Sequence, residues 1–514
     1  PLLPYFWPRK PLTCFSMLLL GIDVGTSSIK VSVVDAQSQE VVASAQYPDT
    51  ENTIQSLQEG WAEQEPAMWW QCVQRAIQRA NATGTYDPLD VAAIGIAYQM
   101  HGLVLTDAAG KSLRPSIIWC DSRAVPYGER AYGKLGASRI LGRLLNAPGN
   151  FTASKLAWVM DNEPEVYAKA DQLMLPGDYI ALRLTGDVTT SVSALSEGIF
   201  WDFSKNELSE DILRVFGFRR ELIPPQRPVF SDHGRLRLDV ASELGLKAGI
   251  PVTYKAGDQP NNALSLNVLE PGEVAATAGT SGVVYAVTDQ ISYDPRSRVN
   301  TFAHVNHHRR EGENRLGVLL CINGTGILNR WMRDEWGAGL GYADINRLAS
   351  EIPAGSEGIR VLPFGNGAER VLENRTLGAL FHGLNFNVHT RAHGFRAAQE
   401  GIAFSLKYGL DIMAATGTQP TVIRAGWANL FLSDVFTQSL VNAAQTPVEL
   451  YDTDGAKGAA LGAGIGLGVF SEPQEAFANL KKLATVEPES GRTDEFQALY
   501  GSWKELLTKM LTDY

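Results

Sequence analysis

Two short phrases of similar sequence constrain the fold of this chain more than any other feature. Gly25-Thr26-Ser27-Ser28 follows the strand-like run 18–24, and Gly279-Thr280-Ser281-Gly282 follows the run 273–277. Each pattern is typical of a strand, a tight turn and a second strand. Turns of this kind direct backbone N–H groups and hydroxyls into one concavity, where they can hold phosphate oxygens. The two copies predict two related halves that hold one polyphosphate between them.

Length and composition limit the class of protein. A chain of 514 residues is too long for one ordinary core, so we expect two domains with a cleft between them. The net charge of -11, without a basic block, argues against nucleic acid as a partner. No apolar run reaches the roughly 20 residues that a membrane span needs, so no membrane partner is expected. The four cysteines are scattered without C-x-x-C spacing, which favours a reducing cytoplasm over disulfides or zinc.

The order of predicted elements indicates an α/β protein with mixed sheets flanked by helices. Residues 1–16 precede Met17 and lack the features of a signal peptide, so we interpret them as an appendage. Residues 17–267 form a first predicted domain that opens with strands near 18–24, 29–34 and 41–47. Residues 268–485 form a second, whose strands near 283–287 and 318–322 repeat this opening. A helical segment is expected over 486–514.

Two aspartates stand where strands end. Asp23 lies two residues before the first turn, where a carboxylate can hold Mg²⁺ directly or through water, although a capped turn is the alternative interpretation. Asp258 follows the β-rich run 251–254 and lies beside Gly257, which lets a ligand approach closely. A carboxylate in that place can accept a proton from a hydroxyl nucleophile. Both aspartates are therefore candidates for phosphoryl-transfer chemistry.

Two further segments are candidates for a small-molecule pocket. Met100 and His101 follow the buried strand predicted at 91–97, at the strand end where α/β proteins bind ligands. A lone histidine is more often structural, so the segment is ambiguous by itself. Trp119, Asp121 and Arg123 combine a flat apolar surface with two charges, as sugar pockets do. The alternative is an internal salt bridge beside a core tryptophan.

The chain resembles the FGGY carbohydrate kinases over nearly its whole length from Met17 onward. The order and separation of seven motifs carry this resemblance. They are Gly21-Ile22-Asp23-Val24-Gly25-Thr26-Ser27, Trp61-Ala62-Glu63-Gln64 with Trp69-Trp70, Gln99-Met100-His101-Gly102, Trp119-Cys120-Asp121-Ser122-Arg123, Leu175-Pro176-Gly177-Asp178-Tyr179, Gly257-Asp258-Gln259 and Gly279-Thr280-Ser281-Gly282.

The resemblance implies an actin-like, ribonuclease-H-like fold in both domains, with ATP, Mg²⁺ and sugar in the interdomain cleft. It implies phosphorylation of a ketopentose in pentose catabolism, with D-xylulose placed before ribulose, glycerol or another polyol. It also implies Asp258 as general base, Asp23 near the metal, and possible assembly as a homodimer. Sugar contacts are expected from Met100, His101, Trp119, Asp121, Asp258 and Gln259, and ATP contacts from Gly25, Thr26, Ser27, Gly279, Thr280, Gly326, Gly426 and Asn429.

The sequence departs from the family pattern in two loops. The family has a run of glycines where Arg424-Ala425-Gly426 stands, followed here by the bulky Trp427. Its Ser-Gly-Glu-Arg-Thr-Pro stretch appears as residues 366–371, Asn-Gly-Ala-Glu-Arg-Val, so that no role is carried over from that loop. Two alternatives of another class stay open: an actin-like ATP-driven binding protein, and a degenerate kinase that only senses sugar. Sugar-stimulated ATP turnover separates these from a kinase.

Overall fold

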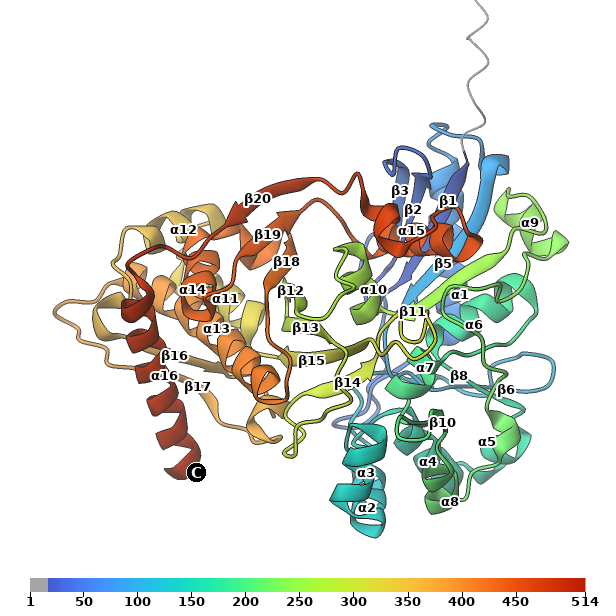
Figure 1. The fold of residues 1–514 in the computed structure, drawn as a ribbon, viewed down its shortest axis with the longest axis horizontal. Coiled ribbons are helices and arrows are strands. Elements are labelled where there is room, and N and C mark those ends of the chain that lie inside the picture. Colours follow the sequence, from blue (N-terminus) through green and yellow to red (C-terminus); the bar gives the residue numbers. More distant parts are fainter. Residues whose placement is uncertain (1–16, 514) are drawn as a thin grey trace, which may run out of the picture.

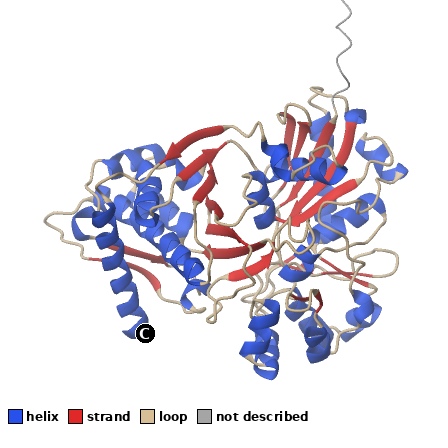
Figure 2. Cartoon of the chain, viewed as in Figure 1, coloured by secondary structure: helices blue, strands red, loops and turns tan. Residues whose placement is uncertain are grey.

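The chain forms two α/β halves, each built on a mixed sheet with helices on its faces. The computed structural model describes residues 17–513, and the predicted appendage 1–16 lies outside them. The halves lie side by side, with the N-terminal half in blue to green and the C-terminal half in yellow to red (Figure 1). Both halves contain strands with helices packed beside them (Figure 2). The predicted α/β class with mixed sheets is confirmed.

The first sheet has five strands in the order β11-β5-β1-β2-β3. Strands β1, β2 and β3 form the predicted antiparallel meander, while β5 and β11 add parallel to it. This sheet contains nearly continuous apolar runs, since both of its faces are covered by helices. The strands are β1 (Leu18–Val24), β2 (Ile29–Asp35), β3 (Val41–Tyr47), β5 (Val91–Tyr98) and β11 (Val252–Gly257).

The second sheet repeats this topology with two strands added. Its order is β14-β15-β13-β12-β18-β19-β20. Here β12, β13 and β15 form the antiparallel meander, and β18 and β19 add parallel to β12, as β5 and β11 do to β1. The related halves inferred from the two turns are therefore present. The strands are β12 (Glu273–Ala278), β13 (Gly282–Thr288), β14 (Asn300–Ala303), β15 (Leu316–Ile322), β18 (Val422–Gly426), β19 (Val448–Tyr451) and β20 (Lys482–Val486).

Helices α1 (Pro66–Asn81) and α6 (Pro176–Thr185) cover one face of the first sheet. Helix α1 begins with proline in its first turn, where the missing N–H has no partner to lose. Trp69, Val73 and Ile77 recur at helical spacing and are fully buried against the strands.

Short strand pairs and further helices surround this core. They are β4 (Glu63–Gln64), β6 (Val104–Thr106), β7 (Ser116–Ile117), β8 (Gln172–Met174), β9 (Trp201–Asp202), β10 (Glu207–Leu208), α2 (Val125–Leu135), α3 (Ala137–Leu144), α4 (Thr152–Asn162), α5 (Pro164–Lys169), α7 (Val192–Glu197), α8 (Glu210–Phe216) and α9 (Leu238–Leu244).

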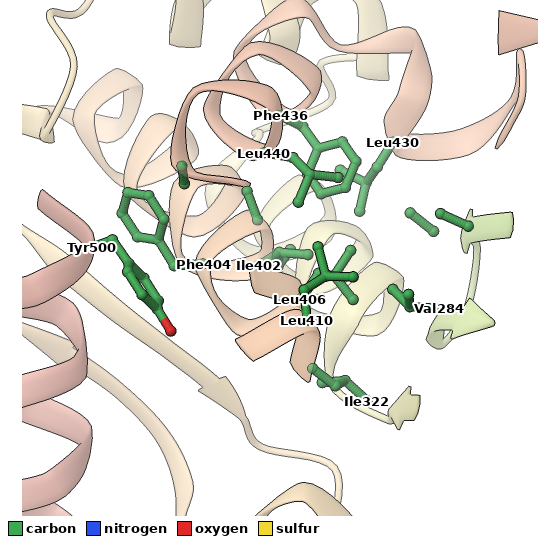
Figure 3. Packing of buried hydrophobic residues seen from close by; sticks show 14 of the residues in the cluster. Val284, Ile322, Ile402, Phe404, Leu406, Leu410, Leu430, Phe436, Leu440 and Tyr500 are labelled. Atoms are coloured by element: carbon green, nitrogen blue, oxygen red, sulfur yellow. The ribbon is translucent and has the colours of Figure 1, made fainter. Parts of the chain in front are cut away.

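The core of the second half is centred on the long helix α13 (Arg391–Ala415). Figure 3 shows Ile402, Leu406 and Leu410 of this helix directed into one apolar cluster with Phe436 and Leu440. Helix α16 packs outside α13, with Tyr500 beside Phe404. The other elements here are α11 (Thr325–Trp331), α12 (Tyr342–Ser350), α14 (Asp434–Ala444), α16 (Thr493–Asp513), β16 (Arg360–Phe364) and β17 (Gly378–His382).

One helix from the C-terminal half lies on the first sheet. Helix α15 (Gly455–Leu467) packs on β1, β5 and β11, next to α10 (Asp258–Ser265), so that the red helix lies against the blue strands in Figure 1. The backbones approach closely because both sides carry small residues. A Cβ at Gly21 would lie 1.9 Å from the Ala456 carbonyl oxygen, and one at Gly95 would lie 2.0 Å from that of Ala459. The chain thus crosses back to complete the first half.

Strand β14 joins the two halves on the other side. Its residue Thr301 donates its N–H to the Asn146 side chain at 2.9 Å, and Asn146 donates in turn to the Thr301 carbonyl. Ala303 makes the equivalent contacts with the hydroxyls of Ser193 and Ser196 from α7. These buried polar contacts fix the rotation of one half against the other.

The helices of residues 17–513 differ from those that cross a bilayer. A membrane span needs about 20 predominantly apolar residues in one helix. No helix in this described part of the chain combines that length with enough apolar character.

Candidate active site

The first predicted phosphate turn lies between β1 and β2 and is supported by three side chains. Thr26 donates its hydroxyl to Gln99 at 3.1 Å and accepts from the Trp119 indole N–H at 3.0 Å. Gln64 donates to the Thr26 carbonyl at 2.8 Å. Residues of four sequence motifs therefore meet at this turn. Their contacts hold the backbone of Gly25, Thr26 and Ser27 in one conformation, as a preformed phosphate site requires.

Two aspartates meet at the carboxyl ends of β1 and β11. Asp23 is the sixth residue of β1, and Asp258 is the first residue of α10, directly after β11. The N-terminus of α15 closes this place, because a Cβ at Gly455 would lie 2.3 Å from Asp23 Oδ2. Glycine at position 455 is therefore required for the helix to come so near the carboxylate. The structure brings the two predicted carboxylates together from positions 235 residues apart in the chain.

Burial and like charge change the acidity of both aspartates. Burial, and then the charge of Asp23, raise the pKa of Asp258 to about 7. Burial, and then the charge of Asp454, raise the pKa of Asp23 to about 6, while Lys30 acts in the opposite direction. Hydrogen bonds from Gln259 favour the ionised form of Asp258. A carboxylate whose pKa lies near neutrality suits general-base catalysis.

The pair of aspartates fits a magnesium ion bound together with phosphates. Mg²⁺ is typically held by one or two carboxylates, with phosphate oxygens and water completing its shell. Within residues 17–513, no three His, Cys, Asp or Glu side chains gather as a metal-binding group. A cation here would therefore rely on Asp23, which lies between the first turn and Asp258. Burial, the main cause of the raised pKa of both carboxyls, disfavours their negative charge, and a bound cation would offset this effect.

His101 and Met100 lie beside Asp258 in the loop after β5. A Cβ at Gly257 would lie 2.6 Å from Met100 Cγ, so glycine at this position admits the methionine. His101 has the left-handed backbone conformation, with φ of 62°. Its ring packs edge-on against Phe151, with 4.7 Å between the ring centroids, and near Phe302 from β14. Burial lowers the pKa of His101 to about 3, so the imidazole is neutral.

Glu197 and Lys155 hold His101 in this conformation. The Glu197 carboxylate accepts the backbone N–H of His101 at 3.0 Å and the Tyr98 hydroxyl at 2.8 Å. Lys155 donates to the His101 carbonyl at 2.7 Å. Both side chains are buried, and burial raises the pKa of Glu197 to about 8 and lowers that of Lys155 to about 7. Sequence reasoning missed these two residues, because nothing in their local sequence distinguishes them from ordinary helix positions.

Trp119 and Asp121 play different parts in the structure. Asp121 is fully buried, and its carboxylate is occupied by Arg123 at 2.7 Å and by the Ala62 N–H at 2.6 Å. Arg123 also lies over the Trp61 ring, 3.7 Å from its centroid. This geometry corresponds to the internal salt bridge, so Asp121 serves to join two sequence motifs. Trp119 is instead exposed and reaches the first turn through Thr26.

The second turn forms one wall of a cavity of about 480 Å³. Gly326 lies against this turn: a Cβ there would be 1.8 Å from the Gly279 carbonyl oxygen, and its N–H donates to the Thr280 carbonyl at 3.1 Å. Four of the predicted ATP-binding residues line this cavity together. They are Gly279, Thr280, Gly326 and Asn429.

The remaining wall of this cavity comes from residues that sequence reasoning did not single out. Among them are Ile327 and Arg330 of α11, Tyr342 and Asn346 of α12, and Leu432. Gly426 ends strand β18 and is not among the lining residues. Arg424, in the segment that departs from the family pattern, lies within strand β18 rather than in the loop that the sequence indicated, and it forms ion pairs with Glu273 and Glu449. The start of the altered segment is thus part of the sheet.

Comparison with known proteins links both halves to one family. Residues 18–265 match the N-terminal domain of the FGGY family of carbohydrate kinases, and residues 274–469 match its C-terminal domain. A xylulose kinase of Escherichia coli (strain K12) is 30% identical, with 96% of this chain and 99% of the relative covered. A xylulose kinase of Bacillus subtilis (strain 168) is 28% identical, with 95% and 96% covered.

Solved structures agree with these matches. The crystal structure of xylulose kinase from Rhodospirillum rubrum superposes with a TM-score of 0.85 at 25% identity, covering 96% of this chain and 99% of that chain. Plasmodium falciparum glycerol kinase with ADP reaches a TM-score of 0.86 at 19% identity, covering 96% and 98%. The second likeness is one of fold alone.

Proposed function

The chain belongs to the FGGY family of carbohydrate kinases, and on this premise we propose that it transfers the γ-phosphoryl group of ATP to D-xylulose, giving D-xylulose 5-phosphate. The family supports sugar kinase activity. The relatives named xylulose kinase, which align over nearly the full chain, support the sugar. The observation that carries the proposal is the position of Asp258 at the end of β11: its neighbour Gly257 lies against Met100, and its charge interacts with that of Asp23.

Asp258 is the proposed general base. Its carboxylate takes the proton of the primary sugar hydroxyl as the hydroxyl oxygen bonds to the γ-phosphorus. The bond from that phosphorus to the β,γ-bridging oxygen breaks, and ADP leaves with the electron pair. Such transfers pass through a loose transition state, so positioning and charge stabilisation supply most of the catalysis. A base of this kind contributes about a hundredfold to ten-thousandfold.

The two turns are the proposed holders of the nucleotide. Gly25, Thr26 and Ser27 would face the transferred phosphoryl group, and Gly279 and Thr280 the other phosphates. Gly326, Gly426 and Asn429 are proposed to contact the nucleoside. The cavity beside the second turn supports this role for Gly326 and Asn429, which line it. Kinases of this family use ATP with a divalent metal. Asp23 is the proposed Mg²⁺ ligand, and the ion would neutralise phosphate charge.

His101 is the proposed acceptor for a sugar hydroxyl. Its Nδ1 lies 3.1 Å from the Glu197 carbonyl oxygen, which can only accept, so Nδ1 carries the proton. The neutral ring therefore presents Nε2 as an acceptor. Met100 supplies an apolar contact, while Gln259 and Trp119 add polar and aromatic ones. Asp121 shapes the site from within through Arg123, rather than by free carboxylate oxygens.

A coupled assay of ADP release with Mg-ATP tests the proposal. The panel is D-xylulose, D-ribulose, L-ribulose, L-xylulose, glycerol and no sugar. We expect selective stimulation by D-xylulose, with little ATP turnover in its absence. Another preferred sugar would retain Asp258 as base and revise the substrate. Turnover that no sugar stimulates would favour an ATP-driven binding protein or a sugar sensor.

A further inference from the structure

Arg370 extends from the second half to the first, and its charge has no partner among residues 17–513. It begins a short helical turn, Arg370–Leu372, and its Cζ lies 5.6 Å from the centroid of the Phe151 ring. Its Nη2 would be 3.7 Å from a Cβ built on Gly149. Among residues 17–513, the guanidinium makes no hydrogen bond within 3.5 Å and no ion pair within 4.0 Å.

The buried arginines Arg123 and Arg396 are paired with carboxylates: Arg123 binds Asp121 and Glu63, and Arg396 binds Glu400. Arg370 is half-buried instead, and among residues 17–513 its five N–H donors have no such partner, which leaves them free to bind a ligand. Burial accordingly lowers the pKa of Arg370 below its usual range. The contact with Phe151 does not satisfy any of the N–H groups, so the guanidinium is poised for an anion that comes from outside the chain.

The loop that carries Arg370 is firmly anchored. The preceding residue, Glu369, is fully buried, and its carboxylate accepts the backbone N–H groups of Asn323 at 3.0 Å and of Gly324 at 3.3 Å. The following residues, Val371 and Leu372, are buried in the core of the second half. The backbone from which the Arg370 side chain extends is therefore held in place on both sides.

Arg370 lies within electrostatic reach of both ends of the proposed reaction. Phe151 packs on the His101 ring. Burial lowers the pKa of His101 to about 3, and the charges of Lys155 and Arg370 add to this effect. On the other side lies Cys321, whose pKa burial raises to about 11. The positive charge of Arg370 lowers this pKa, and the negative charge of Asp258 raises it. Arg370 is thus close to the proposed sugar histidine and to the surroundings of the proposed base.

We infer that Arg370 binds the phosphoryl group while it passes to the sugar, and the phosphate of the sugar-phosphate product afterwards. This inference rests on the proposed function. The planar fork of guanidinium N–H groups matches two phosphate oxygens, and a donor fixed in advance stabilises charge that develops on them. Because Arg370 comes from the second half and His101 from the first, the sugar and the phosphoryl group that it receives together bridge the two halves as transfer proceeds.

The matched variants are Arg370→Met, Arg370→Lys and the control Arg375→Lys. Arg375 lies on the same loop, but its guanidinium donates to the Leu511 carbonyl at 2.8 Å, away from the cleft. We expect Arg370→Met to lower kcat by about a hundredfold to a thousandfold while KM for ATP and for the sugar stay near those of the wild type. Arg370→Lys should have a kcat between those of Arg370→Met and the wild type, and Arg375→Lys should have the kcat of the wild type. Equal thermal midpoints exclude misfolding.

The affinities for two probes, measured by calorimetry, separate phosphate binding from a purely structural role of Arg370. Arg370→Met should bind D-xylulose as the wild type does, but bind D-xylulose 5-phosphate about tenfold or more weakly. Unchanged kcat, or equal losses of affinity for sugar and sugar phosphate, would overturn the inference. Should the wild type prefer another sugar, that sugar and its phosphate replace the probes.

Failure of the proposed function can be told apart from failure of this inference. ADP with aluminium fluoride imitates the planar phosphoryl group and needs no turnover. Trapping of this complex by the wild type, and its loss in Arg370→Met but not in Arg375→Lys, would support the role of Arg370 even if no sugar in the panel were phosphorylated. Equal trapping in all three proteins would overturn it.

Discussion

The backbone N–H of His101 donates a hydrogen bond of 3.0 Å to the Glu197 carboxylate, which ties the loop after β5 to the last residue of α7. This contact matters because His101 has a φ of 62°, a conformation that side-chain-bearing residues seldom adopt. The same carboxylate holds the Tyr98 hydroxyl. Glu197 therefore determines where the imidazole ring stands, although it lies 96 residues away in sequence.

Replacing Glu197 tests this positioning role. Glu197→Ala leaves a buried N–H and a buried hydroxyl without an acceptor, each at a cost of about 1–3 kcal/mol. We expect KM for the sugar to rise about tenfold to a hundredfold, with KM for ATP little changed. Glu197→Gln can still accept from His101 and donate to the Tyr98 oxygen, so it should retain most of the affinity. Equal KM values for Ala and wild type would contradict the role.

Asp258→Asn removes the proposed base with little change of shape. The amide cannot accept the hydroxyl proton, so we expect kcat to fall by about a hundredfold to ten-thousandfold. Affinity for a non-hydrolysable ATP analogue, measured by calorimetry, should remain that of the wild type. A variant that turns over at the wild-type rate would remove Asp258 from the mechanism.

The pH dependence of the reaction follows from the raised pKa of Asp258. The carboxylate form is the active one, and it dominates above a pKa of about 7. We expect kcat/KM for the sugar to fall about tenfold per pH unit below that value and to level off above it. Initial rates between pH 5.5 and 8.5 measure this. The remaining activity of Asp258→Asn should not decrease in this way at low pH. The same decrease in the variant would mean that another group causes it.

The glycine contact between β5 and α15 is expected to limit stability. A methyl group at Gly95 would lie 2.0 Å from the Ala459 carbonyl oxygen, so Gly95→Ala must push the helix from the sheet. We expect a loss of about 1–3 kcal/mol in the free energy of unfolding. Gly133→Ala in α2 is the control, since nothing lies within 4 Å of its new methyl group. It should gain about 0.5–1 kcal/mol. Urea unfolding of both variants decides the matter.

Gly326→Ala probes the proposed nucleotide site. The added methyl group would lie 1.8 Å from the Gly279 carbonyl oxygen and would displace the second turn. Because a displacement of about 1 Å can cost a hundredfold, KM for ATP should rise about tenfold to a hundredfold. Affinity for the sugar alone should not change. Gly142→Ala, with open space around the new methyl group, is the control. Unchanged KM for ATP would separate the second turn from nucleotide binding.

Local sequence was sufficient for the elements of regular structure. The runs before Asp23 and Asp258, the meander after the first turn and its repeat around Gly279 all follow from the alternation of apolar residues and the glycine turns. Those patterns involve neighbours within about ten residues, and their period reports directly on secondary structure. The placement of Asp23, Asp258 and His101 at strand ends followed from the same reasoning.

Contacts between distant parts of the chain could not be inferred in that way. The glycine-dense run 455–467 reads as a helix or a loop by itself, and only the sheet on which it packs shows why glycines are needed there. Glu197 and Lys155 are ordinary helix residues until folding encloses them beside His101.

The sequence by itself determined the two-fold α/β plan, and it predicted the two turns as phosphate sites and Asp258 as a candidate base, because these follow from local periodicity and turn chemistry. The tertiary structure alone decided that the Asp121 carboxylate is paired with Arg123, and that the Arg370 guanidinium lies near Phe151 without a counter-ion among residues 17–513. The physical reason is that burial and pairing of a charge depend on which distant groups come to surround it, and periodicity carries no record of them.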